Sequence, residues 1–154
     1  MKITIISVGK NNDGTVREGI SEFTKRISRA HDIEWRFLAP SSKGGEIAVR
    51  EEALDIENAL RDGDFLVALD VSGKQYSTEQ FAEFLQERLN TGTKRLVFLI
   101  GGAYGIAPSL LKRAQSTWSL SKLTFPHQLV RFILSEQLYR ATSILRNEKY
   151  HHGA

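Results

Sequence analysis

Residues 95–105 read RLVFLIGGAYG, and this segment decides the fold. A short apolar run without polar interruption predicts a strand that is buried on both faces of a parallel sheet. Glycines follow at once, and ligands of open α/β sheets bind at the carboxyl ends of the strands. Backbone without Cβ atoms can approach a flat ligand closely, although a tight turn that needs positive φ values explains the glycines equally well. The segment therefore indicates a buried strand that ends in a candidate binding loop.

The same alternation of short apolar runs and helical periodicity extends in both directions from this segment. Further strands are predicted at residues 2–8, 33–38, 65–69 and 118–120. Helices are predicted at about 16–27, 49–60, 81–89, 107–114 and 127–146. We therefore expect one α/β domain over residues 1–154, with a mostly parallel sheet and helices on both of its faces.

Local signals predict where several helices begin. Thr15 with Glu18, and Ser77 with Gln80, have the spacing of capping boxes. Pro108 suits the first turn of the short helix that follows the glycine loop.

The last predicted helix has apolar residues on two sides. One stripe, which should face the sheet, consists of Val130, Leu134, Leu138, Ala141 and Leu145. Phe132 and Tyr139 fall on roughly the opposite side. A second apolar side favours contact with another subunit, so we expect a homodimer, the alternative being one or two ordinary exposed aromatic residues.

The composition excludes several classes of protein. Hydrophobic residues make up 41% and charged residues 25%, which is typical of a globular chain. There are no cysteines, so disulfides, thiolate metal ligands and thiol catalysis are excluded. No apolar run is long enough to cross a membrane, and we expect a cytoplasmic protein. The net charge of +3 permits a polyanionic partner but fits a small-molecule enzyme equally well.

Common catalytic and nucleotide-binding motifs are missing. The loop at 101–105 does not have the G-x-G-x-x-G spacing, and Gly73-Lys74 lacks the upstream glycine of a phosphate loop. The four histidines are not spaced as metal ligands, and no serine lies in a G-x-S-x-G motif. We therefore expect no metal.

Two regions remain as candidates for chemistry. The first comprises the predicted strand-end loops at 70–74, 101–105 and 121–126. The second is the end of the chain, which gathers hydrogen-bond donors, a stacking surface and imidazoles: Arg140, Asn147, Tyr150, His151 and His152. The default interpretation of Glu136 and Arg140, four residues apart on the last helix, is a solvated salt bridge.

Several motifs, in this order, resemble one bacterial family, the ribosomal RNA large-subunit methyltransferase H family of the SPOUT superfamily. They are LD-x-x-GK at 69–74, LIGG-x-x-G at 99–105, WSLS-x-LT-x-PH-x-LVR at 118–131, EQLYRA at 136–141 and YH at 150–151. The resemblance covers essentially the whole chain.

The resemblance implies a fold and a cofactor site. The C-terminal half would form a deep trefoil knot, a rare exception among protein chains. S-adenosylmethionine would lie in the knot, and the homodimer would pack through the last helix. The residues that would hold the cofactor are Leu69, Gly101, Gly102, Ser121, Lys122, Leu123, Thr124, Phe125 and Pro126.

The resemblance also implies a substrate. A pseudouridine of large-subunit ribosomal RNA, in the ribosome, would be methylated on ring nitrogen three. Arg140 and Tyr150 would position the nucleotide, and His151 would contact it directly or transfer its proton. The methyl donor is already activated, so this chemistry needs no metal.

The end of the chain departs from the family pattern. The family usually closes with Asn-His-Pro-Tyr-His and then Arg or Lys, whereas residues 147–152 read NEKYHH. Which group takes the proton is therefore open.

Two alternatives stand beside the main hypothesis. One is a SPOUT RNA methyltransferase that acts on another nucleotide, and the other is a ribosome-associated binding module without catalysis.

Overall fold

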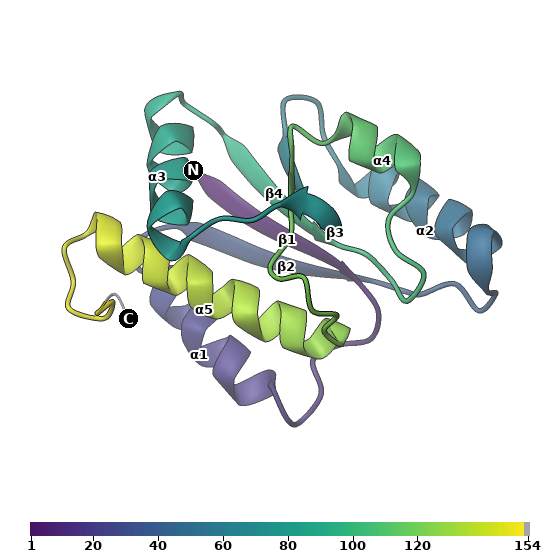
Figure 1. The fold of residues 1–154 in the computed structure, drawn as a ribbon, viewed down its shortest axis with the longest axis horizontal. Helices are drawn as coiled ribbons and strands as arrows, with labels where there is room; N and C mark the ends of the chain where they lie inside the picture. The colour runs from purple at the N-terminus through teal and green to yellow at the C-terminus, as the bar shows by residue number, and fades with distance from the viewer. Residues whose placement is uncertain (153–154) are drawn as a thin grey trace.

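The computed structural model describes residues 1–152 and is built on a five-stranded sheet (Figure 1). The strands lie in the order β2-β1-β4-β3-β5, and every neighbouring pair is parallel. Their bounds are β1 Lys2–Val8, β2 Asp32–Leu38, β3 Phe65–Lys74, β4 Arg95–Ile100 and β5 Ser116–Trp118.

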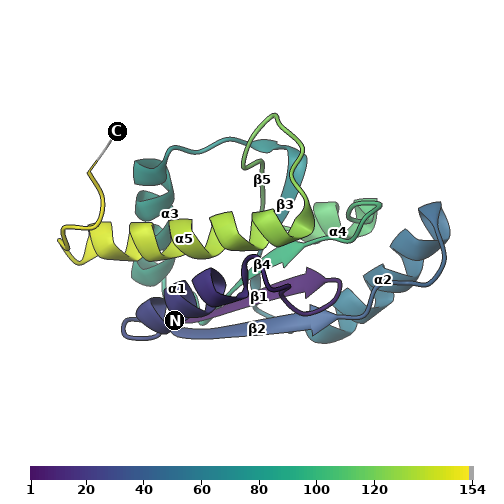
Figure 2. The same ribbon diagram turned by 90° about the horizontal axis from the view of Figure 1, so that it is seen from below.

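Helices cover both faces of this sheet, as predicted (Figures 1 and 2). Their bounds are α1 Arg17–Ile27, α2 Gly45–Ala59, α3 Thr78–Asn90, α4 Pro108–Arg113 and α5 His127–Leu145. Core residues of α1, α3 and α5 pack on one face, and those of α2 and α4 pack on the other. Among residues 1–152, no helix is long and apolar enough to cross a membrane.

Strand β4 lies at the centre of both cores. All six of its residues are buried, and it pairs with β1 on one edge and β3 on the other. Phe98 faces the core under α3 and α5, while Val97 and Leu99 face the core under α2 and α4. Burial on both faces explains why the sequence of this strand is apolar without alternation.

One of the two predicted capping boxes is present. At the start of α3, the Gln80 N–H donates to Ser77 Oγ (3.1 Å), and the Ser77 N–H donates to Gln80 Oε1 (2.8 Å). The box at Thr15 is wrong, because α1 begins at Arg17 without a side-chain cap. Thr15 instead bonds to the Asp13 carboxylate, and the Arg17 N–H donates to the Asp13 carbonyl (2.9 Å), which shifts the first turn.

The segment at 70–74, expected as a loop, belongs to β3. The pairing between β3 and β5 is irregular there, since both Leu69 and Lys74 lie opposite Trp118. A Cβ on Gly73 would lie 2.5 Å from the Trp118 carbonyl carbon, so this glycine permits two backbones to approach closely. The same pairing places β5 at 116–118 rather than at 118–120. The trefoil knot stays a prediction.

The two sides of α5 both pack within this chain. Leu134, Leu138 and Ala141 are fully buried against the sheet, as the predicted stripe required. Phe132 and Tyr139 instead pack on α1, with ring centroids 6.0 and 5.8 Å from that of Phe23. The inference of a subunit contact from these two aromatic residues is therefore wrong, because α1 covers them. The homodimer itself stays a prediction.

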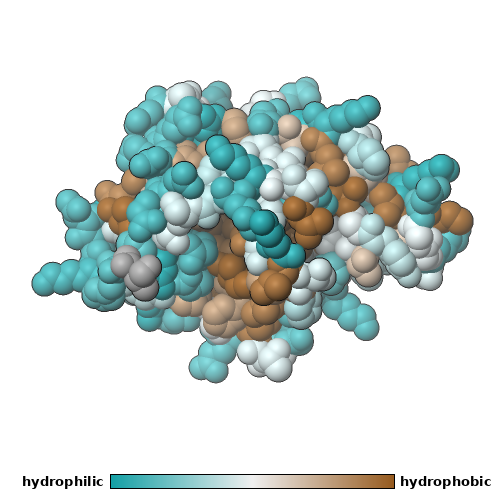
Figure 3. Space-filling view, viewed as in Figure 1, coloured by the Kyte–Doolittle hydropathy of each residue, from teal (hydrophilic) through white to brown (hydrophobic). Residues whose placement is uncertain are grey.

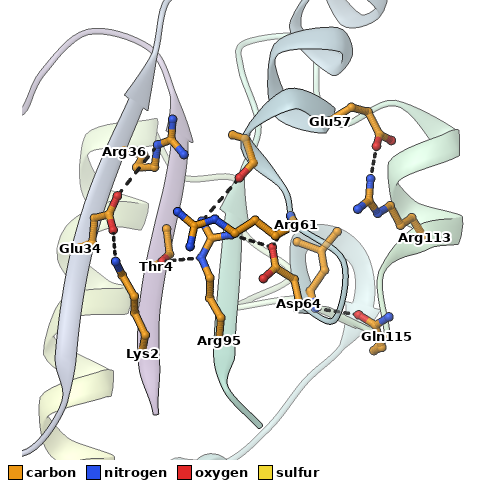
Figure 4. A network of polar contacts seen from close by, with 12 residues as sticks. Lys2, Thr4, Glu34, Arg36, Glu57, Arg61, Asp64, Arg95, Arg113 and Gln115 are labelled. Carbon is orange, nitrogen blue, oxygen red and sulfur yellow. Dashed lines mark hydrogen bonds and ion pairs between the residues drawn. The ribbon is translucent and has the colours of Figure 1, made fainter.

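A buried ion pair fastens the amino-terminal end of the sheet (Figure 4). Arg95 Nη1 lies 2.7 Å from Asp64 Oδ2, and both side chains are less than a tenth exposed. Arg95 Nε also donates to Thr4 Oγ1 (3.1 Å), which connects β4 to β1. The guanidinium depends on Asp64, because a buried charge that loses its counterion keeps its desolvation cost.

Asp64→Asn is therefore expected to lower the free energy of unfolding by about 3 kcal/mol, because it leaves the buried Arg95 cation without a counterion. Urea denaturation of the purified protein measures this change. Asp62→Asn removes the same charge from an exposed neighbour and serves as the control. Equal midpoints for the two variants would contradict a stabilising role for the buried pair.

Candidate active site

A cavity of about 420 Å³ opens at the carboxyl ends of β4 and β5, beside the middle of β3. Its size falls within the range of roughly 300–1,000 Å³ that is common for small-molecule sites. Seven of the predicted cofactor residues line it: Leu69, Gly101, Gly102, Ser121, Leu123, Thr124 and Phe125. Lys122 and Pro126 do not line it, since Lys122 is exposed and Pro126 caps α5. Figure 3 shows hydrophobic residues gathered around a hollow near the middle of one face.

The lining includes residues that sequence reasoning did not assign. They are mainly apolar and come from strand ends, the loop between β4 and α4, and the first turn of α5: Ile100, Ile106, Trp118, His127 and Val130. Among the lining residues, Asp70 is the only acidic one and His127 the only imidazole. Within residues 1–152, no three acidic or histidine side chains gather as metal ligands. The cavity therefore suits a small organic ligand with a flat apolar part.

Short polar contacts shape the loop that leads from β5 to α5. Ser119 Oγ donates to the Ser121 carbonyl (2.9 Å), and the Leu123 N–H donates to Ser121 Oγ (3.0 Å). These contacts fold residues 119–123 back on themselves. The backbone and apolar side chains of this segment consequently form one wall of the cavity.

The glycine loop after β4 is a tight turn packed against α2. The Gly105 N–H donates to the Gly102 carbonyl (3.1 Å), and Gly105 has a φ of +88°, which other residues rarely adopt. A Cβ on Gly101 would lie 2.6 Å from the Ile106 side chain, and one on Gly102 would lie 2.5 Å from Glu52 Oε1. The space left by the missing Cβ atoms is thus occupied by the side chains of Ile106 and Glu52, and it is not space for a ligand in the cavity.

A buried arginine holds the start of α5 beside this cavity. Arg131 Nε donates to Ser7 Oγ (2.8 Å) at the end of β1, and Nη1 donates to the Lys10 carbonyl (2.7 Å). The guanidinium also lies 4.8 Å from the centroid of the Phe37 ring. Burial lowers the pKa of Arg131 from its ordinary value. These contacts fix its neighbour Val130 and, one turn earlier, His127 in the cavity wall.

The three predicted catalytic residues, Arg140, Tyr150 and His151, form one cluster. Arg140 Nη2 lies 2.6 Å from Glu136 Oε1, and its guanidinium lies 4.8 Å from the centroid of the Tyr150 ring. The Tyr150 hydroxyl donates to the same Glu136 oxygen (3.2 Å). Burial, and then the charge of Glu136, raises the pKa of Tyr150, so its phenol stays protonated at neutral pH. Glu136 and Arg140 are therefore more than the solvated pair that their spacing indicated.

The contacts of His151 assign its ring nitrogens. Arg140 Nη1 lies 3.3 Å from Nδ1, and a guanidinium can only donate, so Nδ1 accepts. In the neutral imidazole, Nε2 then carries the hydrogen, which it donates to Glu79 Oε1 (2.9 Å). This hydrogen bond lowers the pKa of the Glu79 carboxyl. Sequence reasoning missed Glu79, because seventy residues separate it from the tail and no local pattern links the two.

The structure does not bring this tail cluster to the cavity of the same chain. His127 lines the cavity at the start of α5, whereas Arg140 lies in the second half of that helix. At 1.5 Å per residue, the path between them spans about 20 Å. Figure 2 shows the described part of the tail, in yellow, beside the end of α5 that is far from the cavity. One chain therefore presents two separate half-sites.

Comparison with known proteins gives a consistent result. Residues 1–151 match a family model described as "Predicted SPOUT methyltransferase". Proteins named ribosomal RNA large subunit methyltransferase H are similar over nearly their whole length. Those from Christiangramia forsetii and Desulfotalea psychrophila are 40% and 43% identical, with 99% and 98% of this chain and 99% of each relative covered.

A solved structure shares the fold. It is described as a probable methylase family protein from Haemophilus influenzae, with a TM-score of 0.56 and 12% identity. The match covers 98% of this chain and 70% of that one. At this identity the likeness concerns the fold alone.

Gly102→Ala is expected to lower the free energy of unfolding of the ligand-free protein by about 1–3 kcal/mol, the usual cost of overpacking. The new methyl would meet Glu52, which is buried and held by the Ser41 N–H and therefore cannot swing away. Urea denaturation measures the change. Gly14→Ala is the matched control, because nothing lies within 4 Å of its Cβ position. If both variants unfold at the wild-type midpoint, the packing behind the loop is not as tight as described.

Proposed function

This chain belongs to the SPOUT methyltransferase family, among the ribosomal RNA large subunit methyltransferase H proteins, and on that premise we propose that it uses S-adenosylmethionine to methylate ring nitrogen three of a pseudouridine in large-subunit ribosomal RNA. The observation that carries the proposal is the cavity at the ends of β4 and β5 beside β3, lined by seven of the nine residues that the family motifs indicated. A ribosomal RNA substrate supports our proposal of a cytoplasmic location.

The cavity residues suit the proposed cofactor. Apolar side chains such as Leu69, Ile100 and Phe125 suit the flat adenine ring, and the backbone of the two loops offers hydrogen-bonding groups beside them. Asp70 provides a negative charge for the cationic methionine part. When bound, S-adenosylmethionine supplies an activated methyl group. The protein has to align the target nitrogen with that methyl group and accept the proton that the nitrogen loses.

The tail cluster supplies groups for the second task. Nδ1 of His151 carries the lone pair, so we assign it as the acceptor of the proton from the pseudouridine ring. Arg140 has to leave Nδ1 first, and an RNA phosphate is a suitable new partner for its guanidinium. Glu79 holds Nε2–H, the arrangement in which a carboxylate orients an imidazole and stabilises its protonated form.

The separation of the two half-sites supports a homodimer. The tail of one protomer would have to reach the cavity of its partner, since its own cavity lies about 20 Å away along α5. Large apolar side chains are exposed beside the cavity, where a partner could cover them: Val71 (70%), Leu123 (69%) and Leu129 (39%). The dimer therefore rests on this separation and these side chains, not on Phe132 and Tyr139.

Titration calorimetry with S-adenosylhomocysteine, followed by mass spectrometry of large-subunit RNA from a deletion strain, tests the proposal. We expect saturable binding by the wild-type protein and the loss of one methyl from a pseudouridine in the deletion strain. Loss of a methyl from a different nucleotide would indicate a SPOUT enzyme with another target. Absence of binding at millimolar concentration would favour a binding module without catalysis.

Mixing two inactive variants tests the shared site. Thr124→Trp fills the cavity from an exposed position, and His151→Ala removes the assigned proton acceptor. Each alone is expected to be inactive on ribosomes. After the two are unfolded and refolded together, mixed dimers should restore about a quarter of wild-type activity, because half of the dimers then hold one intact site of two. Light scattering should give twice the 17.4 kDa chain mass. No recovery from a properly mixed dimer would place both half-sites of the reaction in one chain.

A further inference from the structure

Helix α2 buries a carboxylate on the side that faces the sheet. Its buried residues are Ala48, Glu52, Ile56 and Ala59, so Glu52 occupies a position where the helix otherwise has apolar or small residues. Glu52 is only 5% exposed. Its Oε2 accepts the Ser41 N–H (2.9 Å). Its Oε1 has no hydrogen-bond partner within residues 1–152.

The unpartnered oxygen lies directly behind the glycine loop of the cavity. The Cβ position of Gly102 is 2.5 Å from Glu52 Oε1, and Gly102 itself lines the cavity. Nearby, the Cβ position of Gly44 is 3.2 Å from the Tyr104 hydroxyl, so the glycine loop also touches the segment that leads into α2. Glu52 thus contacts the cavity through one residue of the loop.

An unpaired oxygen on a buried carboxylate is unfavourable, because burial removes water without providing a donor. The opposite oxygen of Glu52 is fixed by the Ser41 N–H (2.9 Å). The acceptor is therefore held in place. The glycine loop packs on this oxygen at Gly102, and the backbone N–H groups of the loop are the candidate donors.

We propose that Glu52 is a positioning residue for the glycine loop: when the cofactor binds, Glu52 Oε1 accepts a backbone N–H of residues 101–105 and holds the loop in its binding conformation. The inference rests on the proposed function, because it takes the cavity as the cofactor site. It assigns to Glu52 no contact with the cofactor or the substrate.

Glu52→Gln tests the proposal with little change in shape. The Ser41 N–H requires an oxygen, so the new amide NH₂ should take the place of Oε1, where a donor would face the loop N–H. Calorimetry with S-adenosylhomocysteine should then give a Kd raised about tenfold, as for loss of a hydrogen bond to a charged group. The KM for S-adenosylmethionine should rise similarly, with kcat unchanged at saturation. The ligand-free protein should unfold at the wild-type temperature or above, because a buried charge has been removed.

Glu51→Gln is the matched control. Glu51 is the neighbouring carboxylate and undergoes the same change of charge, but it is exposed and bonds to Ser41 Oγ and Lys43. We expect its Kd and unfolding temperature to equal those of the wild type.

Three results would overturn the proposal. One is a wild-type Kd for Glu52→Gln with a wild-type unfolding temperature, another is a wild-type Kd with a lowered unfolding temperature, which would indicate a purely structural carboxylate, and the third is equal weakening by Glu51→Gln. These outcomes presuppose that the wild-type protein binds S-adenosylhomocysteine. If the wild-type protein does not bind, the proposed function fails. If the wild-type protein binds and Glu52→Gln binds equally well, only this inference fails, so the two failures are distinguishable.

Discussion

The pairing of β4 with β1 and β3 is the constraint on which the rest of the structure depends. Both edges of β4 are hydrogen-bonded and both faces are covered, so the strand has no freedom to shift without exposing apolar side chains. Its carboxyl end is therefore fixed beside the middle of β3. The glycine loop that follows turns back over this end and packs on α2. The cavity is a direct consequence of this placement.

Helix α5 connects the cavity to the tail and also keeps them apart. Arg131 fastens its first turns to the end of β1, and the stripe through Leu134, Leu138 and Ala141 fixes its length along the sheet. A rigid helix cannot bend to bring its two ends together. The groups that we propose for holding a cofactor and those that we propose for handling a nucleotide consequently lie at opposite ends of one element. A second copy of the chain is the simplest way to unite them.

Three carboxylates contact residues of the candidate site, although none of the three was among the predicted catalytic or cofactor-binding residues. Glu136 binds both Arg140 and Tyr150, and Glu79 fixes the tautomer of His151. Glu52 stands behind the cavity loop in the same supporting position. Glu136 begins the motif at 136–141, whereas Glu79 and Glu52 belong to none of the motifs quoted from the sequence. Each acts through a partner that is distant in the chain or one helical turn away.

The alternation of strands and helices, and the buried character of β4, could be predicted from the sequence. So could the capping box at Ser77 and the motifs at 99–105 and 118–131. All of these depend on patterns among neighbouring residues. Only the tertiary structure decided what Phe132 and Tyr139 touch, why Gly73 and Gly102 have to be glycine, and that Glu79 reaches His151. Each of these contacts joins residues that are far apart in the chain. Periodicity gives the direction in which a side chain points along its own helix, but the partner on that side is chosen by how the helices and strands pack together.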